Sequence, residues 1–293
     1  MATRSQWIAG TRPRTLPAAI APVLVGTAIA DYENSVRPVI AVCALVVALA
    51  LQIGVNFAND YSDGIRGTDD VRVGPVRLVG QQLASPAAVK RAAFLSFTVA
   101  GIAGLVMATV SGLWILLPIG LTAMLAAWFY TGGAKPYGYL GFGEVFVFTY
   151  FGLVAVIGTS ASQTGAISTL SILGGVSCGL LSTAILLTNN LRDIPSDKVA
   201  GKRTLAVRLG DSKTRALYQI TVVSGIGISI AMSLINAGPT LAWIAISAGF
   251  VAVEPIRIIR NDAYGKALIP VLAGTGKTLF VFSLILSFAI ANS

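Results

Sequence analysis

Histidine is absent from this 293-residue chain. Its absence excludes an imidazole general base, a zinc site built on histidine and a histidine-ligated haem. Charge is also scarce, because Asp, Glu, Lys and Arg make up only 11% of the residues, against roughly 25% in an ordinary soluble domain. With a hydrophobic fraction of 55%, this composition excludes a soluble globular protein. The two cysteines stand alone in separate apolar runs, so we expect Cys43 and Cys178 to be packing residues.

Long apolar stretches predict an all-α, polytopic membrane protein. A bilayer core needs about 20 apolar residues per helix. No low-complexity linker divides the chain, so residues 1–293 are expected to form one membrane domain. Nine spans are predicted in one bundle, near residues 15–31, 38–58, 89–110, 113–131, 143–160, 168–190, 214–235, 239–256 and 274–291.

The basic residues predict the orientation of the bundle. If the N-terminus is cytoplasmic, then all of the 21 lysines and arginines except Arg37 fall on the cytoplasmic side. Lysine and arginine accumulate in the cytoplasmic loops of membrane proteins, so the formal net charge of +9 reflects orientation in a cell membrane rather than nucleic-acid binding. The polar loops after spans 2 and 6 are expected to cap the bundle on this side.

Two matching polar motifs end spans 2 and 6. Each is an asparagine followed at helical spacing by two aspartates: Asn56, Asp60 and Asp63 in the first motif, and Asn189, Asp193 and Asp197 in the second. If the helices continue, the members of each motif share one face. Pro195 permits at most a bent last turn, so Asp197 is expected to belong to the loop that follows the helix. The repetition favours a functional pair of sites over helix caps that merely pair with nearby arginines.

The four carboxylates predict a site for magnesium and a diphosphate. Carboxylates gathered at a membrane edge repel one another unless cations neutralise them. Mg²⁺ prefers oxygen ligands and completes its shell with water and substrate phosphate. We therefore expect two Mg²⁺ ions at the two motifs, with Asp60 and Asp193 as the catalytic carboxylates. The side chains expected to bind the diphosphate are Arg66, Arg72, Lys135, Tyr139 and Lys202.

With these motifs the chain resembles the UbiA superfamily of intramembrane aromatic prenyltransferases. The resemblance covers essentially the whole chain, and its specific segments are residues 12–17, 56–69, 130–139 and 189–210. Within the superfamily, the chain is most similar to the members that prenylate 1,4-dihydroxy-2-naphthoate in menaquinone synthesis. One departure concerns the first motif, where Asp60 and Asp63 are separated by two residues instead of the usual three. This departure predicts a different metal contact for Asp63, such as one through water.

The resemblance implies a reaction and its substrates. A long isoprenyl chain passes from a prenyl diphosphate to 1,4-dihydroxy-2-naphthoate, the carboxylate leaves as carbon dioxide, and demethylmenaquinone forms. The implied enzyme depends on Mg²⁺, lies in the cell membrane and has its active site on the cytoplasmic side. Arg12 and Arg14 are expected to face the acceptor carboxylate, unless they serve only as anchors at the membrane surface.

Two alternatives stay open from the sequence. The first is a prenyltransferase with another acceptor, such as 4-hydroxybenzoate, haem, chlorophyllide or a sugar phosphate. The second is a secondary transporter, which also shows an internal repeat and polar residues near helix ends. The acidic residues of the two motifs lie at one membrane face, and this placement favours the enzyme.

Overall fold

The computed structural model describes residues 2–67 and 76–293, and every regular element in these ranges is helical. The elements are α1 (Arg4–Gly10), η1 (Pro13–Thr15), α2 (Pro17–Tyr32), α3 (Pro38–Ile65), α4 (Pro86–Ser111), α5 (Leu116–Phe129), η2 (Tyr137–Leu140), α6 (Gly143–Phe148), η3 (Thr149–Val154), α7 (Ala155–Thr164), α8 (Thr169–Val199), α9 (Leu205–Leu209), α10 (Asp211–Ser233), η4 (Ala242–Ala248), α11 (Gly249–Arg260), η5 (Gly265–Leu268) and α12 (Ile269–Ala291).

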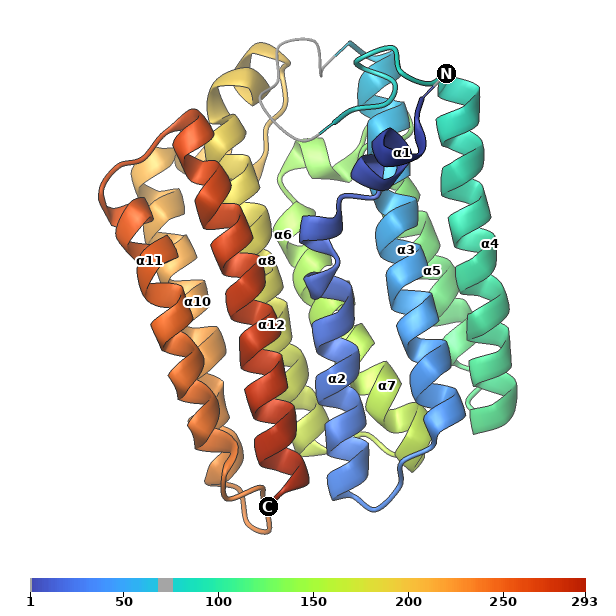
Figure 1. Ribbon diagram of the computed structural model, residues 1–293, viewed down its shortest axis with the longest axis vertical. Coiled ribbons are helices and arrows are strands. Elements are labelled where there is room, and N and C mark those ends of the chain that lie inside the picture. Colours follow the sequence, from blue (N-terminus) through green and yellow to red (C-terminus); the bar gives the residue numbers. More distant parts are fainter. Residues whose placement is uncertain (1, 68–75) are drawn as a thin grey trace.

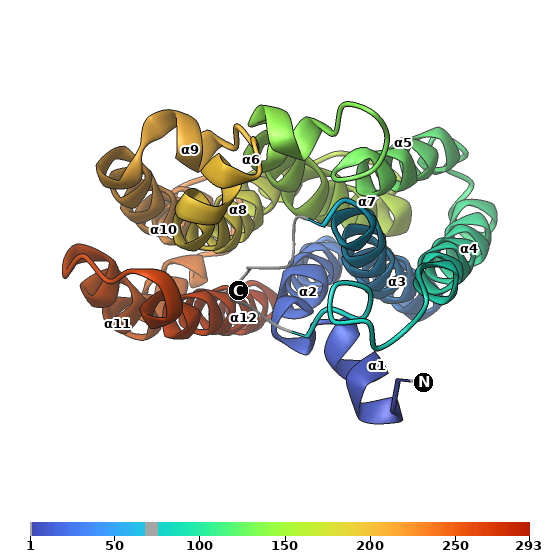
Figure 2. The ribbon, with the colours of Figure 1, turned by 90° about the horizontal axis from the view of Figure 1, so that it is seen from above.

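The long helices run side by side, and the two chain termini lie at opposite ends of the bundle (Figure 1). Helix α1 lies at the end that carries the N-terminus. Seen from that end, α2 lies between α3 and α8 (Figure 2), and it packs against both. The chain therefore brings the helices that carry the two polar motifs to either side of its first long helix.

Seven helical segments among the described residues are long and apolar enough to cross a membrane: Pro38–Ile65, Pro86–Ser111, Gly143–Thr164, Thr169–Val199, Asp211–Ser233, Ala242–Arg260 and Gly265–Ala291. An eighth is added if Arg4–Thr15 and Pro17–Tyr32, which are bent by 52°, form one span. Helix α5 is apolar but has only 14 residues. The predicted all-helical, multi-pass architecture is confirmed, and seven or eight segments meet the length criterion for a span.

The two motif helices are longer than their predicted spans. Helix α3 continues to Ile65 and α8 continues to Val199, so the motif residues stand on helical turns beyond the apolar stretches. The expectation for Asp197 is corrected, because Pro195 lies inside α8 without ending it. A proline this close to the end of a helix removes few backbone hydrogen bonds. Gly67 follows α3 and Gly201 follows α8, each with a positive φ (68° and 69°) that glycine adopts readily.

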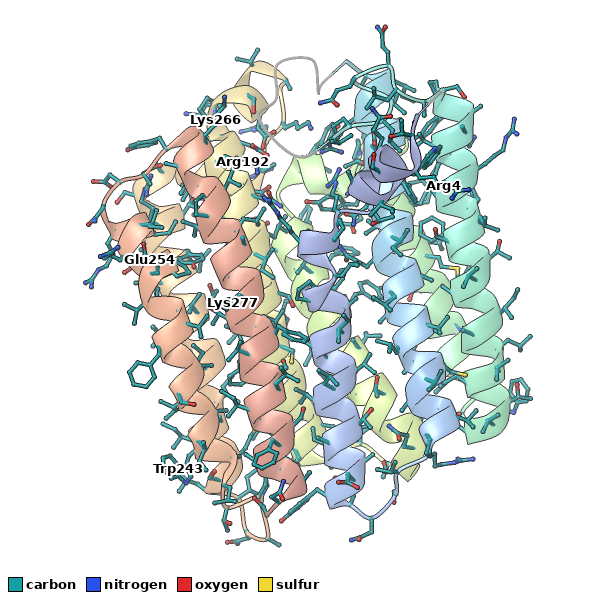
Figure 3. All side chains as sticks on the ribbon, viewed as in Figure 1. Arg4, Arg192, Trp243, Glu254, Lys266 and Lys277 are labelled. Carbon is teal, nitrogen blue, oxygen red and sulfur yellow. The ribbon has the colours of Figure 1, made fainter. Side chains whose placement is uncertain are left out.

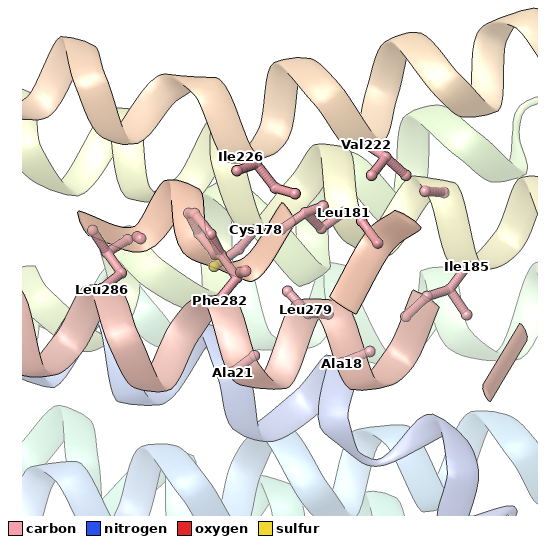
Figure 4. Close-up of a cluster of buried hydrophobic side chains, with 14 of the residues drawn as sticks. Ala18, Ala21, Cys178, Leu181, Ile185, Val222, Ile226, Leu279, Phe282 and Leu286 are labelled. Atoms are coloured by element: carbon pink, nitrogen blue, oxygen red, sulfur yellow. The ribbon is translucent and has the colours of Figure 1, made fainter. Parts of the chain in front are cut away.

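The largest cluster of buried apolar side chains joins α2, α8, α10 and α12. Leu181 of α8 and Phe282 of α12 are fully buried near its centre, beside the thiol of Cys178 (Figure 4). Cys43 is only partly buried, and both cysteines are free. This cluster holds α8 in place and so fixes the helix that carries the second motif.

A glycine contact brings the segment of residues 143–164 against α8. Gly152 lies in the π-helical turn η3, where a Cβ atom would overlap the Cα of Gly179. Gly175 lies one turn before Gly179 and approaches the backbone of Leu153. Small residues spaced four apart let membrane helices approach closely. The Gly175–Gly179 pair therefore serves packing within the bundle.

We predict that Gly152→Ala lowers the stability of the bundle. The added methyl group overlaps backbone atoms, which cannot move away as a side chain can. Such overpacking lowers the free energy of unfolding by about 1–3 kcal/mol. Thermal unfolding of the purified protein in detergent measures the loss. The matched control is Gly227→Ala in α10, because a Cβ at Gly227 has no neighbour within 4 Å. Equal unfolding temperatures for the two variants would contradict the prediction.

Candidate active site

A cavity of about 840 Å³ lies inside the bundle. Most of its wall is apolar, and it extends as far as the loops near Leu113 and Ile167 that join α4 to α5 and α7 to α8. Its polar wall comes mainly from the C-terminal halves of α3 and α8. The lining residues from these two motif regions are Asn56, Asn59, Asp63, Asn189, Asn190 and Asp197. The structure therefore brings the two motifs to one cavity.

Asp63 is a buried carboxylate in the wall of this cavity. It is 2% exposed, and its Oδ1 accepts a hydrogen bond of 2.5 Å from the hydroxyl of Tyr139. The ammonium group of Lys202 lies 3.4 Å from the same oxygen, and the guanidinium of Arg77 lies 3.8 Å from Oδ2. Two cations and a hydroxyl donor thus compensate the charge of a carboxylate that water barely reaches.

Tyr139 and Lys202 connect three segments of the chain at this end. The Lys202 ammonium lies 4.5 Å from the centroid of the Tyr139 ring, in cation–π geometry. The backbone N–H of Lys202 donates to the carbonyl of Asp197, and the N–H of Arg203 donates to the carbonyl of Tyr139, both at 2.8 Å. The end of α3, the turn η2 and the segment after α8 are therefore held together around Asp63.

Asp60 has a different environment from Asp63. It is 1% exposed and is absent from the cavity wall. Its carboxylate accepts backbone hydrogen bonds from Leu78 at 2.7 Å and from Val79 at 3.1 Å. These bonds fix the segment that carries Arg77, which faces Asp63. Direct metal binding by Asp60 stays a prediction.

Asp193 is likewise buried and absent from the cavity wall. The guanidinium of its neighbour Arg192 donates one hydrogen bond to each carboxylate oxygen, from Nε to Oδ1 at 2.7 Å and from Nη2 to Oδ2 at 2.8 Å. Arg192 lies at the same end of the bundle as Arg4 and Lys266 (Figure 3). A catalytic or metal-binding role for Asp193 also stays a prediction.

Two asparagine side chains of α3 form hydrogen bonds to other segments of the chain. Asn56 donates to the carbonyl of Thr11 at 2.9 Å and to the hydroxyl of Thr15 at 3.2 Å. Asn59 lines the cavity and accepts a 2.8 Å hydrogen bond from Thr131. Sequence reasoning missed Asn59, although its position four residues before Asp63 places both on one helical face.

The predicted basic residues separate into three groups. Lys202 and Arg12 line the cavity, and Arg12 is half-buried with a left-handed backbone (φ 52°). Arg66 lies 5.5 Å from the centroid of the Tyr139 ring and donates to the carbonyls of residues 131 and 133. Arg14 and Lys135 are exposed and are absent from the cavity wall. Arg72 lies outside the described residues.

A row of four aromatic side chains lines the cavity beside the polar end: Tyr130, Tyr137, Phe146 and Tyr150. The rings of Tyr137 and Phe146 are stacked, with centroids 4.0 Å apart. Burial, and secondarily the neighbouring Tyr150, raise the pKa of Tyr137 above its ordinary value. Tyr137 therefore stays neutral and donates a 2.9 Å hydrogen bond to the carbonyl of Ala126.

Known proteins resemble this chain over nearly its whole length. The sequence pattern of the UbiA prenyltransferase family matches residues 19–267. The 1,4-dihydroxy-2-naphthoate octaprenyltransferase of Mycobacterium tuberculosis is 48% identical, over 99% of this chain and 98% of that protein. The protein of the same name from Escherichia coli is 34% identical, over 96% of this chain and 95% of that protein.

The chain belongs to the UbiA prenyltransferase family. Its fold agrees with that assignment, since a solved UbiA homolog from Archaeoglobus fulgidus bound to GPP and Mg²⁺ superposes with a TM-score of 0.72. The alignment covers 98% of this chain and 100% of the solved one, at 14% sequence identity. At this sequence identity, the superposition supports the fold of this UbiA family member. It does not identify its substrates.

The donor set of this UbiA family member suits a hard cation. The described residues contain no group of three or more histidine, cysteine, aspartate or glutamate side chains arranged to hold a metal by themselves. What the cavity offers is one carboxylate from each motif, Asp63 and Asp197, beside the amides of Asn56 and Asn189. Mg²⁺ typically takes one or two protein carboxylates and leaves its other positions to water and phosphate oxygens. The residues present therefore fit magnesium bound together with a phosphate-bearing substrate.

We predict that Asp60→Asn destabilises this UbiA prenyltransferase. The substituted amide keeps one acceptor oxygen but turns an NH₂ group toward a backbone N–H donor, and an unsatisfied buried group of this kind costs about 1–3 kcal/mol. Thermal unfolding in detergent measures the effect. Asp31→Asn is the control, because Asp31 is exposed and lies outside the cavity wall. An unchanged unfolding temperature for Asp60→Asn would show that the bonds to residues 78 and 79 contribute little.

Proposed function

We propose that this protein transfers a long isoprenyl group from a prenyl diphosphate to 1,4-dihydroxy-2-naphthoate with decarboxylation, which gives demethylmenaquinone for menaquinone biosynthesis. The names of full-length relatives at 48% and 34% identity support this reaction. The structural observation that carries it is the single cavity that combines a polar end, formed by both motifs, with a long apolar interior.

The shape of the cavity suits a lipid diphosphate. Its polar end holds Asp63, Asp197 and Lys202, and its apolar wall continues to the far loops near Leu113 and Ile167. A prenyl tail placed along this wall buries its methylene and methyl groups, while the diphosphate stays among charged side chains. The bundle thus offers separate environments for the two parts of one substrate.

Magnesium is proposed at the polar end. Asp63 and Asp197, with Asn56 and Asn189, would hold two Mg²⁺ ions, one at each motif. Bound Mg²⁺ would supply positive charge to the leaving diphosphate. Lys202, Tyr139 and Arg66 are proposed to bind the remaining diphosphate oxygens, because Lys202 and Tyr139 contact Asp63 and Arg66 lies over the Tyr139 ring.

Asp60 and Asp193 are proposed to position this site. Asp60 fixes the segment that presents Arg77 to Asp63, and Asp193 fixes the guanidinium of Arg192. Direct metal contact by either carboxylate requires that it exchange its present partner for the ion. Loss of activity on substitution is expected in both cases, and the positioning role of Asp60 also requires the loss of stability predicted above.

The walls of the cavity support the bond-making step. The C–O bond to the diphosphate breaks with its electron pair on oxygen, and the electron-rich ring of the acceptor bonds to the allylic carbon. The carboxylate then leaves as carbon dioxide and returns its electrons to the ring. Apolar walls keep water from the allylic cation. The π faces of Tyr137 and Phe146 offer it favourable electrostatics.

Arg12 is proposed to face the carboxylate of the acceptor. It lines the cavity near the first motif, and its left-handed backbone places it at the bend before α2. Arg14 is exposed and is proposed to anchor the bend at the membrane surface. The two arginines therefore receive different roles.

Nine membrane helices are proposed, with α2 and the short α5 added to the seven longer spans. The termini lie at opposite ends of the bundle (Figure 1), which requires an odd number of crossings. The end with α1 also carries Arg4, Arg192 and Lys266, while Trp243 lies near the other end (Figure 3). Because basic residues favour the cytoplasmic side, the N-terminus and the polar end of the cavity are proposed to face the cytoplasm across the cell membrane.

We predict that the purified protein, supplied with Mg²⁺ and a long prenyl diphosphate, converts 1,4-dihydroxy-2-naphthoate to a prenylated naphthoquinol and releases carbon dioxide. Mass spectrometry of the extracted product is the measurement, run with a panel of acceptors. Prenylation of 4-hydroxybenzoate with no product from the naphthoate would contradict the proposed acceptor. It would not contradict the proposed binding site for the diphosphate.

We predict that Asp63→Ala and Asp197→Ala abolish product formation, because each removes a carboxylate from the cavity. Chelation of divalent cations should abolish the wild-type activity, and added Mg²⁺ should restore it. Asp31→Ala is the control, since Asp31 is exposed and outside the cavity. Full activity in either site variant, or after chelation, would contradict the metal–diphosphate mechanism.

A further inference from the structure

One buried carboxylate next to the cavity has no part in the scheme above. Glu144, in the first turn of α6, is 5% exposed. Its Oε1 accepts a 2.8 Å hydrogen bond from the side-chain amide of Asn190. Its Oε2 is also buried and has no hydrogen-bond partner among the described residues. Buried carboxylates are rare inside a membrane bundle and mark functional positions by default.

Glu144 dictates how Asn190 is oriented. A carboxylate oxygen accepts hydrogen bonds, and the amide of Asn190 has donors only on its nitrogen. The nitrogen therefore faces Glu144, and the carbonyl oxygen is directed away from it. Asn190 lines the cavity whereas Glu144 does not, so the group presented toward the cavity is a hydrogen-bond acceptor.

The residues around Glu144 suit a flat aromatic ligand. Gly143 lies so close to Tyr130 that a Cβ atom would come within 3.1 Å of its ring. Phe146, two residues after Glu144, stacks on Tyr137 at 4.0 Å between centroids. The same short helix thus provides part of the aromatic wall and holds the adjacent amide. Ring stacking beside a single acceptor oxygen is the chemistry that recognises a hydroxylated aromatic ring.

We infer that Glu144 is a positioning residue that fixes the Asn190 amide as a hydrogen-bond acceptor for a hydroxyl group of the aromatic acceptor. This inference rests on the proposed function and adds a determinant of specificity to it. The hydroxyl donates to the Asn190 oxygen while the ring packs against Tyr137 and Phe146. An acceptor whose hydroxyl is replaced by a methoxy group cannot donate, so it binds less well.

The test compares the hydroxylated acceptor with its O-methyl ether. Wild-type protein should prefer the hydroxylated acceptor by at least about tenfold in kcat/KM, since a site built to bond a hydroxyl rejects an analogue without it. Glu144→Leu frees the amide to turn, so this preference should fall to about twofold or less. The KM for the aromatic acceptor should rise about tenfold, while the KM for the prenyl diphosphate should change less than about twofold.

A reciprocal exchange tests the orientation itself. Glu144→Gln combined with Asn190→Asp reverses the hydrogen bond, because the new amide donates and the new carboxylate at position 190 presents acceptor oxygens to the cavity. This double variant should keep most of the wild-type preference that Glu144→Leu loses. Thr183→Val is the packing control, because the Thr183 hydroxyl donates to the backbone carbonyl of Glu144, at 3.5 Å, and not to its carboxylate. It should keep the wild-type preference.

Three outcomes would overturn the inference. The first is an unchanged hydroxyl preference in Glu144→Leu, and the second is a rise in KM confined to the prenyl diphosphate. The third is a preference lost equally in Thr183→Val, which would assign the effect to packing of α6 on α8. A wild-type protein that prenylates no aromatic acceptor would overturn both this inference and the proposed function.

Discussion

The arrangement of this protein depends on keeping carboxylates stable at the edge of a membrane bundle. Asp63 is nearly inaccessible to water, so its charge is balanced by Lys202, by Arg77 and by the hydroxyl of Tyr139. Each of these partners comes from a different segment: the segment after α8, the segment before α4 and the turn η2. Compensating one buried charge therefore draws three separate loops together, and the polar end of the cavity forms where they meet.

The sequence predicted the parts of this fold that periodicity and hydropathy determine. The spans near residues 38–58 and 168–190 correspond to α3 and α8, and the two motifs stand at the ends of these helices as expected. The glycines after the motifs, Gly67 and Gly201, both end a helix with positive φ. The predicted ends of these helices were less accurate, because the last turns of α3 and α8 are polar and hydropathy does not mark them as helical. Contacts of Asp63 with Tyr139, Lys202 and Arg77 stabilise the last turns of α3, and the backbone bond from Lys202 to the carbonyl of Asp197 closes the end of α8.

Side-chain roles within the motifs could not be predicted from spacing alone. The irregular spacing made Asp63 the doubtful member, yet it is Asp63 that lines the cavity, while Asp60 accepts hydrogen bonds from Leu78 and Val79. Helical periodicity places both carboxylates near one face and does not say where the following loop returns. The same limit applies to Glu144, whose partner Asn190 is distant in sequence and adjacent only after α6 packs on α8.

The central claim is that the two motifs bind metal and diphosphate through the carboxylates that line the cavity. A structure determined with Mn²⁺ in place of Mg²⁺, together with a prenyl diphosphate, tests it most directly through the anomalous signal of the metal. The account predicts metal ions that would be held directly by carboxylate oxygens of Asp63 and Asp197 together with the diphosphate, while Asp60 stays bonded to residues 78 and 79. Metal bound by Asp60 and Asp193 alone, with Asp63 still paired to Tyr139 and Lys202, would contradict it.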